Sequence, residues 1–322
     1  MKLSVSSVFL SLLLAGHSLA ATYSLSDNFQ GNAFFSDFSF QAIADPTHGR
    51  VNYVDQTTAQ NLGLATVSGS NFILRADDTT VLSASGPGRN SFRLQSNKQY
   101  STHVAVFNIA HMPQGCGTWP AVWELGDNWP NEGEVDIVEG VNDQPPNAST
   151  LHTTAGCTMP ASGRTETGNP TSTDCNTADN GNAGCGVQTT DANNYGPAFN
   201  NNGGGWYAIE RTSAFIKVWF WARNAGGIPS DVTSGASSVN TDNWGTPDAY
   251  FPNTDCDFAS HFGPHNIIIN LTFCGDWAGS VYGNSGCPST CEGISQSAHY
   301  VNNNPSAFNN AYFEFPWIKV YE

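Results

Sequence analysis

Three carboxylates lie close together in the segment GEVDIVEG, residues 133–140. Its alternating apolar residues predict a β-strand, in which Glu134 and Asp136 share a face while Glu139, five residues after Glu134, points to the other face. The segment and its tryptophan-rich approach contain no lysine or arginine to separate these like charges. Acids grouped without a countercharge indicate split pKa values, because one carboxyl keeps its proton when its neighbour is ionised.

A β-bulge after Asp136 would bring the third acid into phase with the other two. With Ile137 or Val138 as the extra residue, Glu139 returns to the face of Glu134. Their Cα atoms would lie about 13 Å apart, and inward-leaning side chains would bring the carboxyls to about 5–6 Å. A retaining glycosidase has this separation, with one carboxylate as nucleophile and the other as acid and then base. The alternative is a solvated acidic edge or a calcium site.

Tryptophans gather beside this strand. Trp119, Trp123 and Trp129 precede it, and Trp277 lies in FCGDWAG. A single tryptophan is usually a core residue, but a sugar ring stacks its C–H face on indole while polar groups bind its hydroxyls. Tryptophans next to three carboxylates therefore indicate a saccharide site.

The elements that must position these residues are β-strands. Short β-branched and aromatic runs alternate with Gly, Asn and Pro clusters, and long amphipathic helical patterns are absent, which predicts an all-β sandwich or barrel. No linker or repeat divides the chain, so one domain is expected. The segment from Thr154 to Gly205 departs from this rhythm. We expect it to be a functional loop held down by disulfides of Cys157, Cys175 and Cys185.

Composition narrows the possible partners. The 322 residues include 11 basic and 27 acidic side chains, a formal charge of −16, which argues against nucleic acid or an anionic membrane as partner and leaves a neutral carbohydrate. Residues 1–20 combine one lysine, an apolar run too short to span a bilayer and small residues near Ala20, which predicts a cleaved secretory signal peptide. Eight cysteines in a secreted chain then predict up to four disulfides rather than a zinc site.

The acidic motif, with GCGTWPAVW upstream and NIIINLTFCGDWAG downstream, resembles glycoside hydrolase family 16, specifically its fungal secreted endo-β-1,3(4)-glucanases or laminarinases. GEVDIVEG looks like the bulged form of that family's motif, E-x-D-x-x-E. The similarity runs from HGRVNYVD to IKVYE, so residues 21–322 are expected to form one catalytic domain. The resemblance implies a concanavalin A-like jelly roll, a β-sandwich of two curved antiparallel sheets with an open substrate cleft.

The resemblance also implies residue roles. Glu134 would be the nucleophile, Glu139 the general acid/base, and Asp136 the residue that orients Glu134. Five further residues would bind glucose units: Trp123, Trp129 and Trp277 at subsites, His152 near the reacting sugar, and Arg93 on the non-reducing side. A structural histidine and a surface ion pair remain the alternatives for the last two. Glu132, a fourth acid before the motif, departs from the family pattern and would raise nearby pKa values if it shared the strand face.

The expected function is that of a secreted, monomeric endo-β-glucanase that cleaves β-1,3 and mixed β-1,3/1,4-glucans with retention. It would need no cofactor and no catalytic metal, and a bound calcium would be structural. One alternative is a cell-wall glucan transglycosylase on the same fold. Another is a non-catalytic β-glucan-binding protein, which would be expected to lack Glu134 or Glu139.

Two asparagines fit the N-glycosylation pattern. Asn147 follows QPP, which cannot continue a strand, so we expect it in an exposed turn and modified. Asn270 lies within the apolar run NIIINLTF, so we expect it to be buried or paired and modified less often.

Overall fold

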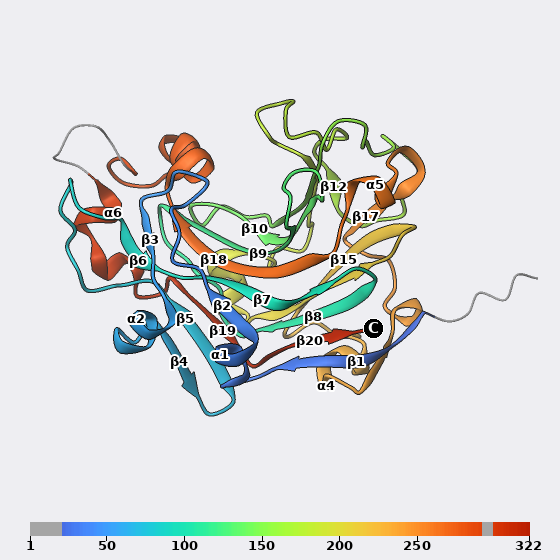
Figure 1. The fold of residues 1–322 in the computed structure, drawn as a ribbon, viewed down its shortest axis with the longest axis horizontal. Coiled ribbons are helices and arrows are strands. Elements are labelled where there is room, and N and C mark those ends of the chain that lie inside the picture. Colours follow the sequence, from blue (N-terminus) through green and yellow to red (C-terminus); the bar gives the residue numbers. More distant parts are fainter. Residues whose placement is uncertain (1–20, 292–298) are drawn as a thin grey trace, which may run out of the picture.

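The computed structural model of the chain describes residues 21–291 and 299–322, so the predicted signal peptide lies outside the described residues. Two large antiparallel sheets stack on each other (Figure 1). The first has seven strands in the order β16 (Ser238–Asn240), β1 (Thr22–Phe29), β20 (Trp317–Tyr321), β8 (His103–Ile109), β14 (Gly205–Arg211), β15 (Phe215–Ala222) and β17 (Ala249–Pro252). The second has eight, in the order β12 (Asn169–Pro170), β13 (Cys185–Gln188), β11 (Ala148–His152), β10 (Glu134–Glu139), β9 (Thr118–Gly126), β18 (His265–Phe273), β7 (Arg93–Tyr100) and β2 (Phe38–Phe40).

Smaller elements surround this sandwich. Two small sheets combine β19 (Tyr312–Phe315), β5 (Asn71–Arg75) and β4 (Ala65–Ser68) in one, and β3 (Val51–Tyr53) with β6 (Arg89–Ser91) in the other. The α-helices are short: α1 (Ala33–Asp37), α2 (Gln56–Asn61), α3 (Gly196–Asn201), α4 (Ser230–Ser234), α5 (Phe258–His261) and α6 (Tyr300–Asn303). Single turns of 3-10 or π type are η1 (Thr241–Asn243), η2 (Asn253–Asp255), η3 (Gly275–Gly279), η4 (Tyr282–Asn284) and η5 (Pro305–Phe308). None of the helices in the described part of the chain is long and apolar enough to cross a membrane.

Strand alternation decides which face of each sheet is buried. Val122 of β9 and Ile269 of β18 point between the sheets and share one hydrophobic core with Phe107 and Ile209 of the seven-stranded sheet. The opposite face of the seven-stranded sheet is buried as well, because Val106, with neighbours on β14 and β15, packs in a second cluster with residues around α4. The eight-stranded sheet, whose strands curve in Figure 1, has polar and aromatic residues on its outer face. That face is the one available to a ligand.

All eight cysteines form disulfides, as predicted from their number in a chain expected to be secreted. The pairs are Cys116–Cys287, Cys157–Cys256, Cys175–Cys185 and Cys274–Cys291. Two of them hold the Thr154 to Gly205 segment, one within it and one to the chain before α5, which confirms the expectation that this segment is fastened. The segment contains β12, β13 and α3 and so is partly regular.

Candidate active site

The predicted bulge is present in β10. The pairing of β10 with β9 shifts between Asp136 and Val138, so Ile137 is the extra residue. The three acids pair with every second residue of β9: Glu134 with Leu125, Asp136 with Trp123, and Glu139 with Ala121. Because residues two apart on a strand share a face, the bulge puts all three acids on one side of the sheet. The predicted carboxyl separation of about 5–6 Å stays a prediction.

Glu139 is held by an indole and by a buried amide. The Nε1 of Trp119 donates a hydrogen bond of 2.9 Å to its Oε1, and its backbone N–H donates to Oδ1 of Asn147 at 2.8 Å. Burial raises the pKa of the Glu139 carboxyl to about 7, although the Trp119 bond and the charge of His152 oppose the rise. A carboxyl with this pKa keeps its proton in mildly acidic and neutral solution, as a general acid must.

Glu134 is held by a different indole. The Nε1 of Trp129 donates to its Oε2 at 2.5 Å, and the Trp129 ring remains 45% exposed. Each of the two glutamates thus accepts one indole N–H, and burial raises the pKa of Glu139.

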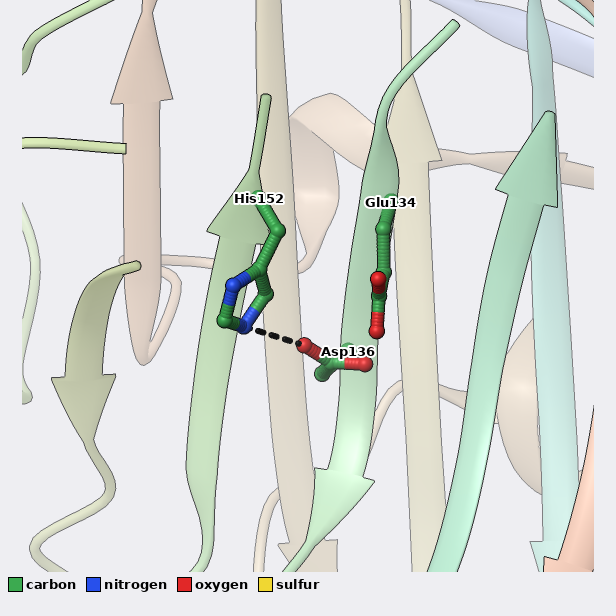
Figure 2. Close-up of side chains that lie close together, drawn as sticks. All are labelled: Glu134, Asp136 and His152. Atoms are coloured by element: carbon green, nitrogen blue, oxygen red, sulfur yellow. Dashed lines mark ion pairs between the residues drawn. The ribbon is translucent and has the colours of Figure 1, made fainter. Parts of the chain in front are cut away.

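Asp136 and His152 form an ion pair beside the glutamates, because His152 of β11 is the cross-strand neighbour of Glu134. Figure 2 shows His152 on β11 pointing toward Asp136 on β10, and the Nε2–Oδ2 distance is 3.3 Å. On its other side, Nδ1 of His152 lies 3.0 Å from Oδ1 of Asn182 in the disulfide-held segment. Burial and the charges of Glu134 and Glu139 raise the pKa of Asp136 well above its ordinary range. Burial alone lowers the pKa of His152, but Asp136 and the two glutamates outweigh it and raise that pKa to about 10.

The same residues are the candidates for a metal site. Ligand atoms of Glu134, Asp136 and His152 lie within 4.8 Å of one another, the one such group found among the described residues. A histidine binds metal only through an unprotonated nitrogen. Since the pKa of His152 is raised to about 10, a proton competes for that position at neutral pH. The arrangement fits proton chemistry better than metal binding.

Arg93 and Trp123 lie together on the same face of the sheet. The guanidinium carbon of Arg93 lies 4.9 Å from the centre of the Trp123 ring. Arg93 is buried and donates from Nε to Oε1 of Gln41 at 2.8 Å, while Trp123 donates from Nε1 to Oδ1 of Asn270 at 2.7 Å. Arg93 is thus part of a packed layer on this face and not a surface ion pair. Its contact with sugar hydroxyls stays a prediction.

Trp277 lies on the turn η3 after β18, at the end of the face near Glu139. Its ring meets the Trp119 ring edge to face, with centroids 5.6 Å apart. Trp277 also lines a cavity of about 270 Å³ together with Gln144 and Pro145 from the chain after β10. The structure therefore links Glu139 through Trp119 to Trp277, and Trp277 lines this cavity.

The structure decides the placement of Glu132, which the sequence left conditional, and shows that the prediction of an exposed Asn147 was wrong. Glu132 does not join the acids, because β10 begins at Glu134 and Oε2 of Glu132 accepts the backbone N–H of Asn128 at 2.9 Å. Asn147 is not in an exposed turn but completely buried, with its side chain bonded to the bulge. Asn270 is buried and paired, as expected.

Sequence reasoning did not assign Trp119 or Asn147 to the site. Trp119 was grouped with the other tryptophans, and its position two residues before Ala121, the partner of Glu139, would have placed it beside that acid once the bulge was fixed. Asn147 carried no local signal beyond its place at the start of β11. Its role depends on contacts with residues ten positions earlier.

A curved β-sandwich with paired carboxylates on a bulged strand defines a glycoside hydrolase of the jelly-roll type. Comparison with known proteins gives the family: residues 38–321 match the description of XgeA-like, catalytic GH16 domains, and the chain belongs to glycoside hydrolase family 16. It is 44% identical to a probable glycosidase of Schizosaccharomyces pombe, covering 94% of this chain and 70% of the yeast protein. It is 43% identical to a probable endo-1,3(4)-β-glucanase of Aspergillus clavatus, covering 99% of this chain and 50% of that protein. The chain thus spans about half the length of its Aspergillus relative.

Solved structures agree with this assignment. Laminarinase 16A from Phanerochaete chrysosporium, with 6-O-glucosyl-laminaritriose in its donor and acceptor sites, is 63% identical with a TM-score of 0.91, over 94% of this chain and 100% of that one. An elongating GH family 16 β-1,3-glucosyltransferase is 41% identical with a TM-score of 0.85, over 93% and 100% of the two chains. The jelly-roll fold expected from the sequence is confirmed.

Proposed function

We propose that this protein is a secreted endo-acting β-glucanase that hydrolyses β-1,3 and mixed β-1,3/1,4-glucans by retaining double displacement. The observation that carries the proposal is the pair of unlike glutamates on one face of β10. Burial raises the pKa of Glu139 to about 7, whereas Glu134 accepts its indole N–H from Trp129, a residue that is 45% exposed. A retaining glycosidase needs one protonated and one ionised carboxyl at the same bond.

The two steps assign a task to each group. In the first step, an oxygen of Glu134 attacks the anomeric carbon while Glu139 donates its proton to the departing glycosidic oxygen. In the second step, Glu139 removes a proton from water, which displaces Glu134 and restores the enzyme. Asp136, which lies between the two glutamates along β10, orients Glu134. His152 supplies positive charge beside the acids, on the neighbouring strand, and is itself held by Asn182.

Sugar units would follow the aromatic residues across the outer face of the eight-stranded sheet. Trp123 with Arg93 lies near β18 and β7, Trp129 lies at Glu134, and Trp277 borders the cavity near Glu139. This order extends on both sides of the acids, which favours binding in the middle of a chain and therefore endo cleavage. The names of relatives as endo-1,3(4)-β-glucanases support the same substrate class.

A glucan transglycosylase is the second candidate. The similarity to an elongating β-1,3-glucosyltransferase favours it, as does the cavity lined by Trp277 and by Gly140, the residue after Glu139, which has room for a second sugar. A non-catalytic glucan-binding protein is disfavoured, because both Glu134 and Glu139 are present in an arrangement that binding alone does not require.

A digestion series tests the proposal. Purified protein is incubated with a β-1,3-glucan, a mixed-linkage glucan and a β-1,6-glucan, and products are followed by mass and linkage. We expect oligosaccharides of several sizes early in the reaction with the first two glucans. Glucose as the sole product would contradict endo cleavage, and products longer than a defined oligosaccharide substrate would favour the transglycosylase. Light scattering on the same sample tests the expected monomer.

A further inference from the structure

The bulge that aligns the acids leaves backbone groups to be satisfied from elsewhere. Strand β10 pairs regularly with β11 from Glu134 to Asp136, and its register with β9 shifts after Asp136. The C=O of Ile137 and the N–H of Glu139 lie in the irregular stretch. Buried backbone groups without partners are costly, so something must bond to both.

One side chain bonds to both groups. Nδ2 of Asn147 donates to the C=O of Ile137 at 3.0 Å, and Oδ1 of Asn147 accepts the N–H of Glu139 at 2.8 Å. The hydroxyl of Ser149 adds a second, longer bond of 3.2 Å to the C=O of Ile137. An asparagine amide supplies one donor and one acceptor in a fixed plane, so it can replace the strand neighbour that the bulge lacks.

Asn147 is itself fixed by its surroundings. It is completely buried. Its backbone N–H donates to Oδ1 of Asn194 at 2.7 Å, and its C=O accepts from the N–H of Thr189 at 3.0 Å. Asn194 donates in turn to the C=O of Thr189 at 3.2 Å. The amide that holds the bulge is therefore anchored to the chain after β13 and cannot turn away without breaking several buried bonds.

We propose that Asn147 is a positioning residue for the general acid/base, an inference that rests on the proposed function. By fixing the backbone of Glu139 on one side and of Ile137 on the other, it sets where the Glu139 carboxyl meets the glycosidic oxygen. Proton transfer depends strongly on such placement, since an error of about 1 Å can cost about 100-fold in rate. The same geometry excludes a glycan, because Nδ2 is buried in the bond to Ile137. Peptide mapping of the folded protein should find Asn147 unmodified.

The test compares a step that needs the proton with one that does not. Cleavage of β-1,3-glucan requires Glu139 as acid, whereas release of nitrophenolate from an aryl β-glucoside oligomer does not. Asn147→Asp keeps the shape and the acceptor but loses the donor, and Asn147→Ala loses both. We expect about 10- to 100-fold lower kcat on glucan in Asn147→Asp, with the nitrophenolate burst within about threefold of wild type.

Asn200→Ala is the matched control. Asn200, on α3, also bonds a backbone through both ends of its amide, since Oδ1 accepts the N–H of Met112 and Nδ2 donates to its C=O. Asn200→Ala should lower Tm, while the ratio of glucan cleavage to nitrophenolate release should stay as in wild type. Equal losses on both substrates in the Asn147 variants, or no loss, would overturn the proposal.

A crystal structure of Asn147→Asp separates this inference from the proposed function. We expect a changed register after Asp136 or a displaced Glu139 side chain, and an unchanged bulge would contradict the inference. If wild type fails to cleave any glucan, the proposed function falls while the structure of the variant still decides the role of Asn147. If Asn147→Ala does not fold, both the activity comparison and the crystal structure are obtained with Asn147→Asp.

Discussion

A group of three carboxylates and a single buried carboxylate lie on opposite faces of neighbouring strands, and their pKa values shift in opposite directions. On the outer face of β10 are the three acids already described. On the inner face of β9 is Glu124, which pairs in register with Val135 of β10 and points between the two sheets. Strand alternation alone sends these carboxyls to different sides.

The inner cluster surrounds Glu124 with nitrogen-bearing side chains. Nε2 of His103 lies 2.7 Å from its Oε1, while Nη1 of Arg211 and Nδ1 of His265 lie 3.6 and 3.9 Å from its Oε2. His103 and Arg211 belong to the seven-stranded sheet, so the cluster connects the two layers. Burial raises the pKa of Glu124, but these neighbours outweigh burial and hold it below its ordinary value.

The difference teaches that burial does not by itself decide how a carboxyl titrates. Glu124 is fully buried and Glu139 is partly buried, and burial raises the pKa of both, yet the net pKa of the first falls and that of the second rises to about 7. Arg211 and two histidines lie around the first carboxyl, whereas at the second burial outweighs the Trp119 hydrogen bond and the charge of His152. One arrangement stabilises the fold and the other keeps a proton ready for transfer.

The largest expected effect is the loss of turnover when either outer glutamate is removed. Glu134→Ala should lower activity on glucan by at least about 10⁴-fold, because no nucleophile remains. Glu139→Ala should accumulate the glycosyl-enzyme with an activated aryl substrate, and azide should release a β-glycosyl azide. With azide, Glu134→Ala should give the α-anomer instead. The opposite anomers would reverse the two roles.

The next effect is on stability, at the inner cluster. Glu124→Gln leaves Arg211 buried without its counter-ion, and we expect a loss of about 3 kcal/mol in the free energy of unfolding at pH 7. Because the folded pKa of Glu124 is lowered, its contribution is present above the unfolded value and disappears as pH falls through the folded pKa. The deficit in urea unfolding should therefore shrink in acid.

The control for this prediction is a surface pair. Lys98 and Glu322 form an exposed ion pair at 2.5 Å. Glu322→Gln should cost less than about 1 kcal/mol, because water screens exposed charges. A Glu124→Gln protein as stable as the control variant at pH 7 would show that the inner cluster does not stabilise the fold.

The outer cluster should show the opposite sign. The folded pKa of Glu139 is raised from 4.5 to about 7, so the wild type loses stability as pH rises through that range. Glu139→Gln stays neutral and should match wild type at pH 4 but exceed it by about 1–2 kcal/mol at pH 8, an amount reduced by the partial exposure of the side chain. Urea unfolding at both pH values measures this. Lower stability of the variant at pH 8 would disprove the raised pKa.

The smallest expected effect concerns Trp119. Its hydrogen bond stabilises the ionised form of Glu139, so Trp119→Phe should raise the pKa of that carboxyl further. The alkaline limb of kcat/KM, expected near pH 7 in wild type, should move upward by up to about one unit. Trp129 bonds to Glu134 instead, so Trp129→Phe should leave the alkaline limb of kcat/KM in place. A downward shift in Trp119→Phe would contradict the assignment.

Much of the fold was predictable because its signals are local. Alternating residues between turn clusters gave the sandwich, and a carboxylate out of phase gave the bulge in β10, since a period of two tolerates no other correction. Eight cysteines in a chain expected to be secreted predicted up to four disulfides. Asn147 shows the limit: a local rule for the residue after QPP predicted exposure, but Asn194, 47 positions later, covers it.

The sequence by itself determined that three acids of β10 share a face next to tryptophans, because the order of residues along a strand fixes the direction of each side chain. Only the tertiary structure decided which acids have raised pKa values, which indole bonds to Glu139, and that Asn147 bonds to the backbone of the bulge. The physical reason is that pKa values and buried hydrogen bonds depend on what lies across space. Burial of Glu139, the charges around Glu124 and the partners of Asn147 come from segments brought together by folding.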